Sequence, residues 1–124
     1  MPDLLEQSAQ WLRAMNRQFR GKTVVYRRGA AQKEIIATVG RTVFTVDTGY
    51  GLFERVESRD YLVDVEELAD LGIPLRGDKV REAVGNSVHV FEVLAPGQEP
   101  HFRYSDPGRT VYRIHTKHVG TEPT

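Results

Sequence analysis

The pattern of apolar and polar residues divides the chain into one helical segment followed by a long β-rich segment. Between residues 3 and 20, apolar side chains recur every three or four positions, which is the spacing of one face of a helix. The residues on this face are Leu5, Ser8, Leu12, Met15 and Phe19, with Leu4 and Trp11 at its edge. Asp3 and Glu6 suit the first turn of a helix, and Gly21 suits its end. The pattern therefore predicts an amphipathic helix over residues 3–20.

After Gly21 the spacing changes to that of short β-strands. β-branched and aromatic residues alternate with polar ones in segments that are separated by glycine, proline and asparagine. The expected strands cover residues 23–28, 34–39, 41–46, 56–65, 79–84, 87–94 and 110–119. Gly40 is expected to separate the second strand from the third, and Gly85-Asn86 predicts a two-residue hairpin turn.

The remaining segments are predicted to be loops and turns. Residues 66–72 resemble a single helical turn that is closed by Gly72, and residues 48–51 resemble the end of a hairpin. Residues 95–107 contain three prolines, so we expect an ordered loop with one short strand at most. Residues 120–124 are expected to form a flexible tail.

Together these segments predict a mainly β (α+β) fold in a single domain, 1–124. Its parts are an N-terminal amphipathic helix (1–21), a small antiparallel β-barrel-like body with long loops (22–119) and the tail (120–124). Many short strands at this spacing favour a closed or partly closed barrel over a parallel sheet. No linker or internal repeat divides the chain.

Composition narrows the class of protein. The chain has 124 residues and no cysteine, which excludes disulfides, thiolate zinc sites and cysteine nucleophiles. Its first residues lack the basic start and apolar run of a signal peptide, and no stretch approaches the roughly 20 apolar residues of a membrane span. We therefore expect a soluble chain that stays inside the cell.

The formal net charge of zero conceals three unequal blocks. Residues 1–33 carry a net charge of +5, residues 34–70 carry −6, and residues 71–124 carry +1. A nucleic-acid-binding domain usually has a basic excess overall, because phosphate contacts supply much of its affinity. Opposed blocks fit protein partners better, including further copies of the same chain, because complementary patches guide association.

No set of residues in the sequence predicts catalysis or metal binding. His115 and His118 are three apart, which on a strand places them on opposite faces, and His89 and His101 add no ligand spacing. Ser58 lacks the Gly-x-Ser-x-Gly setting of an exposed nucleophile, as does Ser105. The acids between residues 54 and 70 could form a carboxylate pair, but a solvated or partner-facing surface is the simpler interpretation. We predict a protein that is not an enzyme and has no cofactor and no metal.

The order of several short segments resembles a known family. A helix ending near Phe19 is followed by Val24-Val25-Tyr26-Arg27-Arg28-Gly29 and Thr38-Val39-Gly40-Arg41-Thr42. The later segments are Ser58-Arg59-Asp60-Tyr61-Leu62-Val63, Pro74-x-x-Gly77-Asp78-x-Val80, and the stretch from Tyr104-Ser105-Asp106 to Arg113-Ile114-His115. This order is similar to that of the small head–tail joining proteins of tailed bacteriophages and prophages, also called head completion, stopper or neck proteins.

The resemblance implies a structural role in the virion. Such proteins are small and β-barrel-like, and they assemble as a ring, usually of six or twelve copies, below the portal of a DNA-filled head. They close or extend the DNA channel and present the surface to which the tail attaches. The implied partners are other copies of the chain, the portal or adaptor ring, and tail terminator or tail tube proteins. The implied locations are the head–tail junction and, during assembly, the host cytoplasm. The resemblance also implies that the ring encloses DNA without sequence-specific contact and that no membrane is involved.

Two groups of residues are candidate contacts in such an assembly. The first is electrostatic. The basic face of the predicted helix, Arg13, Arg17 and Arg20, would contact acidic residues on a neighbour. These acids are Glu54, Glu57, Glu66 and Glu67. The second consists of aromatic anchors in two loops that we expect to reach a neighbour, 49–53 and 95–107. These anchors are Tyr50, Phe53, Phe102 and Tyr104. Each group has an alternative: the arginines are an ordinary solvated face, or the aromatics fold back onto the barrel.

Two other functions remain open from the sequence. One is a small OB- or SH3-like module that binds nucleic acid or a peptide, which requires a basic and aromatic groove. The other is an enzyme that uses the acidic block with His89 or His115, which requires a pocket with convergent carboxylates.

Overall fold

The computed structural model describes residues 21–97 and 99–123. The predicted helix at 3–20, including Arg13, Arg17 and Arg20, lies outside these residues. Within them, seven strands and one short 3-10 helix follow in order: β1 Lys22–Arg28, β2 Ala31–Asp47, β3 Phe53–Asp64, η1 Val65–Leu68, β4 Lys79–Val84, β5 Ser87–Val93, β6 Phe102–Tyr104 and β7 Val111–Pro123.

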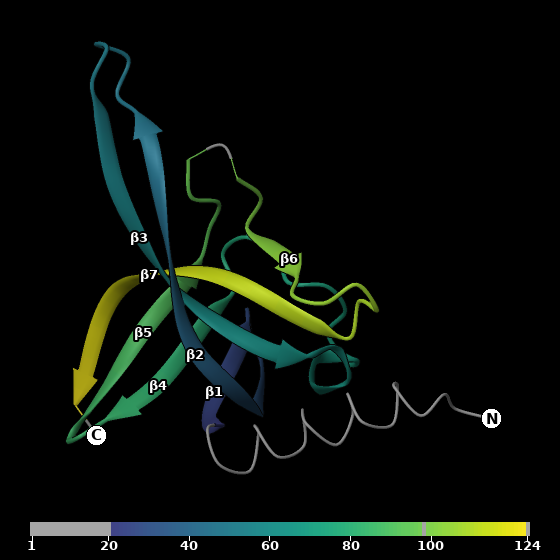
Figure 1. Cartoon of the computed structure of the whole chain (residues 1–124). Coiled ribbons are helices and arrows are strands. Elements are labelled where there is room, and N and C mark those ends of the chain that lie inside the picture. Colours follow the sequence, from purple (N-terminus) through teal and green to yellow (C-terminus); the bar gives the residue numbers. More distant parts are fainter. Residues whose placement is uncertain (1–20, 98, 124) are drawn as a thin grey trace.

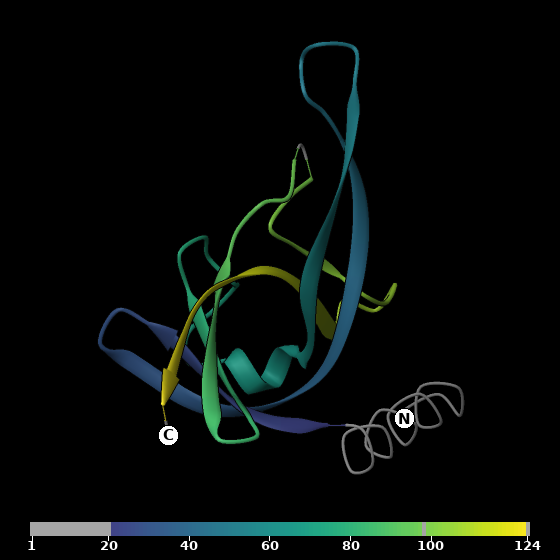
Figure 2. The ribbon, with the colours of Figure 1, turned by 90° about the vertical axis from the view of Figure 1, so that its left-hand side faces the viewer.

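The strands form one antiparallel sheet that closes on itself. The order along the sheet is β3-β2-β1-β4-β5-β7-β6, and an additional pairing joins β3 to β7. This last pairing completes a circuit of six strands, β1-β2-β3-β7-β5-β4, while β6 pairs with β7 only. The strongly curved strands enclose a central space in Figures 1 and 2. The predicted mainly β, barrel-like body is therefore confirmed.

Side chains alternate between the inside and the outside along each strand, and those that point inward fill the barrel. Buried apolar side chains come from six strands, and the most enclosed are Val24, Tyr26, Ile35, Ala37, Tyr61, Val63, Val80, Val93 and Ile114. Leu68, from η1, closes one end of this core. β-branched and aromatic residues suit these positions because they pack well on a pleated surface.

Several predicted elements are confirmed. The two-residue turn at Gly85-Asn86 joins β4 to β5, with Val84 paired to Ser87. The predicted helical turn is η1, and Gly72 follows it with a φ of +82° and donates its N–H to the Leu68 carbonyl at 2.8 Å. The one short strand expected in the 95–107 loop is β6.

Two boundaries predicted from the sequence are wrong. Gly40 does not interrupt a strand, because β2 runs unbroken from Ala31 to Asp47 and Gly40 pairs with Asp60 of β3. The tail predicted from residue 120 is instead the end of β7, where Ser87 pairs with Pro123. In both cases pairing with a distant strand supplies the backbone hydrogen bonds that local composition does not predict.

Candidate functional site

The distal half of the β2–β3 hairpin leaves the barrel as a two-stranded projection. β1 pairs with β2 only as far as Ala37, and β7 pairs with β3 only as far as Arg59. Beyond these points β2 and β3 pair with each other alone, from Thr42↔Ser58 to the end at Asp47↔Phe53. Residues 43–57, here called the distal ribbon, project from the body in Figure 1 and Figure 2. At the base of the ribbon the Phe44 ring still packs against His115 of β7, with centroids 5.2 Å apart.

The tip of the distal ribbon is an ordered turn with large apolar side chains on its outside. Thr48 donates its N–H and its hydroxyl to the Leu52 carbonyl at 3.0 and 3.1 Å, and Gly49 and Gly51 have φ of +91° and +75°. Tyr50 is 89% exposed, Leu52 67% and Phe53 71%. A turn fixed in this way, with exposed aromatic and aliphatic groups, is typical of a surface that another protein covers.

The other two predicted anchors lie against the barrel. Phe102 and Tyr104 of β6 are half-buried, and both pack against the core cluster. The Tyr112 ring is 5.5 Å from each of theirs, measured between centroids. The structure therefore favours the fold-back alternative for these two aromatics, whereas Tyr50 and Phe53 project from the ribbon.

The predicted acidic contacts do not form one patch. Glu54 and Glu57 lie on the exposed distal part of β3, and Glu57 is 3.7 Å from Arg41 across the ribbon. Glu66 and Glu67 lie in η1, beyond the opposite end of β3. A partner that contacts Glu54 and Glu57 therefore binds a different part of the surface from a partner that contacts Glu66 and Glu67.

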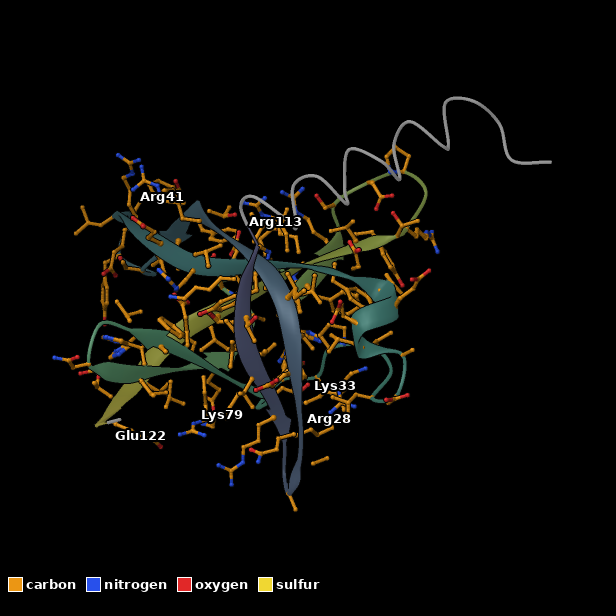
Figure 3. All side chains as sticks on the ribbon, turned by 90° about the horizontal axis from the view of Figure 1, so that it is seen from below. Arg28, Lys33, Arg41, Lys79, Arg113 and Glu122 are labelled. Carbon is orange, nitrogen blue, oxygen red and sulfur yellow. The ribbon has the colours of Figure 1, made fainter. Side chains whose placement is uncertain are left out.

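Three other acids are buried, and each is bound by an arginine. Asp60, Asp78 and Glu82 are 0%, 3% and 1% exposed. Their arginine partners come from other strands. Arg113 Nε donates to Asp60 at 2.7 Å. Arg28 contacts both oxygens of Asp78 at 3.0 and 2.9 Å, and Arg59 contacts both oxygens of Glu82 at 2.9 and 2.7 Å. Figure 3 labels Arg113 and Arg28 on opposite sides of the body, so these pairs are separate clusters.

Ser58, Asp60 and His115 lie together, but not in the arrangement of a catalytic triad. Ser58 Oγ donates to Asp60 Oδ1 at 2.6 Å, and His115 Nδ1 contacts the same oxygen at 2.8 Å. A triad requires the serine on one ring nitrogen and the carboxylate on the other. Here Ser58 Oγ lies 3.4 Å from the same Nδ1, so the serine and the histidine both serve the buried carboxylate.

Hydrogen bonds hold these carboxyl groups in their charged form. Burial of Asp60 acts to raise its pKa, but hydrogen bonds from His115, Ser58 and Thr42 outweigh burial and lower the pKa to about 2. Burial likewise opposes ionisation of Asp78 and Glu82. Contacts with Arg28 and Tyr26 keep the pKa of Asp78 below its normal value. Contacts with Arg59, Lys22 and Tyr61 do the same for the pKa of Glu82. The three acids therefore serve the stability of the barrel.

Comparison with known proteins identifies a family. The family model described as phage head-tail joining protein matches residues 2–123. The chain belongs to this family. A search of the curated proteins finds no match.

Membership of the phage head-tail joining family supports a structural connector in the virion, at the head–tail junction, that contacts other head and tail proteins. It also fits the distal ribbon, since a connector needs surfaces that reach its neighbours. Within residues 21–97 and 99–123, no helix is long and apolar enough to cross a membrane.

A hollow on the side of this head–tail joining protein lies where β3 and β7 diverge. It has a volume of about 690 Å³ and is lined by Val39, Gly40, Arg41, Glu57, Ser58, Arg59, Phe91, Thr116, Lys117 and His118. Arg59 lies over the Phe91 ring at 5.0 Å and is bound to Glu82, and Arg41 is next to Glu57. The hollow holds one acid among several cations, which does not provide the convergent carboxylates that the enzyme alternative requires.

One pair of potential metal ligands was not predicted from the sequence. His89 of β5 and His118 of β7 are 29 positions apart, yet His89 Nδ1 and His118 Nε2 lie 3.2 Å from each other. The signal for this approach is the pairing of the two strands, which local spacing does not reveal. Among the described residues, no group of three or more potential metal ligands lies together.

Proposed function

We propose that this phage head–tail joining protein assembles as a ring below the portal, where it closes or extends the DNA channel and presents the surface for tail attachment. Family membership and the exposed apolar tip of the distal ribbon support this proposal. A ring of six or twelve copies would repeat the same contact between neighbouring subunits. The partners on either side would be the portal or adaptor ring and a tail terminator or tail tube protein.

The observation that carries the proposal is the distal ribbon itself. In a ring the contact is heterologous, so a projecting element of one subunit meets a different surface of the next. The ribbon projects from the barrel, and its tip exposes Tyr50, Leu52 and Phe53. Burial of such residues at a protein contact contributes affinity through the hydrophobic effect.

The edges of the distal ribbon offer a second means of contact. In the described chain no strand pairs with the outer edge of β2 beyond Ala37 or with that of β3 before Arg59. Unpaired strand edges carry backbone N–H and C=O groups that can pair with a strand of another chain. A neighbour or a tail protein could therefore extend the sheet here.

A direct test removes the two aromatic side chains of the tip without altering the barrel. Tyr50→Ser with Phe53→Ser should leave the folded chain intact and reduce its attachment to portal-bearing, DNA-filled heads at least tenfold. Ile73→Ser is the matched control, because Ile73 is a 51% exposed apolar side chain outside the ribbon. Cryo-electron microscopy of the heads would count the added copies. Equal attachment of the double variant and the control would contradict a role for the ribbon.

The electrostatic hypothesis is tested separately. Reversing Arg13 and Arg17 to Glu should block assembly, because both charges would then repel the acids of the 54–70 region on a neighbouring subunit or on the adjacent ring. The urea-unfolding midpoint should stay near that of the unmodified chain if these arginines serve a contact. Normal assembly of this variant would leave the arginines as a solvated face.

The hollow between β3 and β7 supports a second candidate function, a binding module for nucleic acid or peptide. Arg41, Arg59 and Lys117 surround it and Phe91 forms part of its wall. Two of these cations already contact acids, which weakens this candidate relative to the connector. Tight DNA binding by the isolated chain that falls steeply between 50 and 200 mM salt, at about the slope of several phosphate contacts, would favour it.

A further inference from the structure

We propose that His89 and His118 form a surface binding site for a divalent transition metal of the Zn²⁺, Ni²⁺ and Cu²⁺ class. The inference is independent of the proposed connector function. It rests on two imidazole nitrogens from different strands that already face each other, His89 Nδ1 and His118 Nε2, 3.2 Å apart.

The separation of these two nitrogens matches that of two ligands on one metal. Zinc binds imidazole nitrogen at about 2.0–2.1 Å, so two nitrogens 3.2 Å apart would subtend roughly 100° at the metal. This angle lies between the values of octahedral and tetrahedral coordination. The separation therefore allows both nitrogens to bind one metal in place of the His89–His118 hydrogen bond, with each ring turned so that its nitrogen points at the metal.

The strands fix the position of both rings. β5 and β7 pair antiparallel, with Phe91 opposite His118 and His89 opposite Thr121, and the register shifts between Val90 and Phe91. The Phe91 ring packs against the His118 ring at 5.3 Å and near the His89 ring at 6.4 Å. Packing of this kind limits the side-chain freedom that metal binding would otherwise have to remove.

The chemistry of the pair favours borderline metals over Ca²⁺ or Mg²⁺. Both ligands are imidazoles, which suit zinc, copper and nickel, whereas calcium and magnesium prefer oxygen. His118 Nε2 is also 3.2 Å from Thr121 Oγ1. Arg59, which lies over the Phe91 ring, contacts both oxygens of Glu82, a carboxylate that it shares with Lys22.

Two protein ligands leave the other coordination positions to water or to a side chain of another molecule. His118 is exposed and His89 is half-buried, so these positions face solvent. We therefore expect one metal per chain and an affinity in the micromolar range, with Cu²⁺ the tightest of the three by the general order of divalent metals.

The test is isothermal titration of the full chain, prepared without a histidine tag, with NiCl₂ and ZnCl₂. The unmodified chain should bind one ion, and His89→Ala and His118→Ala should each weaken binding at least tenfold. His101→Ala is the matched control, because His101 contacts the Pro74 carbonyl at 2.7 Å and lies outside the pair. Circular dichroism establishes that each variant is folded.

Two outcomes would overturn the proposal. One is the absence of measurable binding by the unmodified chain at 100-fold excess of either metal. The other is equal binding by the unmodified chain and by a folded double variant, His89→Gln with His118→Gln, which would assign the metal to other groups. Glutamine keeps a polar side chain at both positions, so loss of binding in that variant cannot be attributed to loss of the strand pairing.

Discussion

At the scale of single residues, the barrel is held by buried ionic contacts as well as by its apolar core. Asp60, Asp78 and Glu82 are each charged, enclosed and bound to an arginine from a distant strand. Removing one member of such a pair leaves the other without its partner in a place that water does not fully reach. These contacts therefore couple strands that are far apart in the sequence.

Glu82 provides the clearest test of this coupling. Glu82→Ala should lower the free energy of unfolding by about 3 kcal/mol, because Arg59, Lys22 and the Tyr61 hydroxyl all lose their acceptor. Urea unfolding measures the change. Glu57→Ala is the control, because that carboxyl is exposed and its contact with Arg41 is 3.7 Å long, so a loss below about 0.5 kcal/mol is expected. Similar losses in both variants would contradict the assignment.

The same carboxyl groups predict sensitivity to acid. Their pKa values in the folded chain lie below those of the unfolded chain, as for Asp60 at about 2. The unfolded chain therefore binds more protons as the pH falls, and stability that is complete above about pH 5 should decline toward pH 2. Thermal unfolding between pH 7 and pH 2 measures this decline, and in Asp60→Asn it should be shallower. A melting temperature that stays constant down to pH 2 would contradict the account.

The sequence gives no local sign of which acids are buried. Asp60 lies in the same acidic block as Glu54 and Glu57, for which the sequence favours a solvated or partner-facing surface. It is enclosed because it lies opposite His115 in the β3–β7 pairing, next to Arg113 of β7. His89 and His118 illustrate the same limit, since only the register of β5 and β7 brings their rings together.

At the scale of elements, the β2–β3 hairpin combines two roles. Its proximal half is part of the barrel, where Ala37 pairs with Val63, and its distal half projects beyond every other strand that the structure describes. The sequence predicted the hairpin end at 48–51 but divided β2 at Gly40. A Cβ at Gly40 would meet Arg113 and Leu62 side-chain atoms at an ordinary 3.5 Å, so nothing in the packing requires a break there.

The independence of these two halves can be measured by shortening the hairpin. Replacing residues 46–54 with Asn-Gly would connect Thr45 to Arg55, which already face each other. The free energy of unfolding should change by less than about 1 kcal/mol, because the removed residues contribute nothing to the buried core. Attachment to heads should be lost.

A full-length polar ribbon is the control for this truncation. Tyr50→Ser, Leu52→Thr and Phe53→Thr keep its length and remove the exposed apolar groups of its tip. If the polar ribbon attaches as well as the unmodified chain while the truncated one does not, reach matters and apolar contact does not. A truncated chain that fails to fold would show that the ribbon supports the barrel.

Over the whole of the described chain, residues 21–97 and 99–123, a closed barrel carries one long two-stranded projection. Hydrophobic alternation in the sequence was enough to predict a mainly β, barrel-like body, because alternation reports which face of each strand is buried. It could not predict the order in which strands pair. The closure between β3 and β7, and the addition of β6 to the edge of β7, depend on contacts between segments distant in the sequence.

The proposed function depends on assembly of this phage head–tail joining protein into a ring at the head–tail junction. The most direct measurement is cryo-electron microscopy of portal-bearing, DNA-filled heads from the same phage, incubated with the purified protein. The account predicts added density below the portal in six or twelve symmetric copies, with distal ribbons reaching a neighbouring subunit or the channel. Heads without added density at that position, under conditions in which the chain is folded, would contradict it.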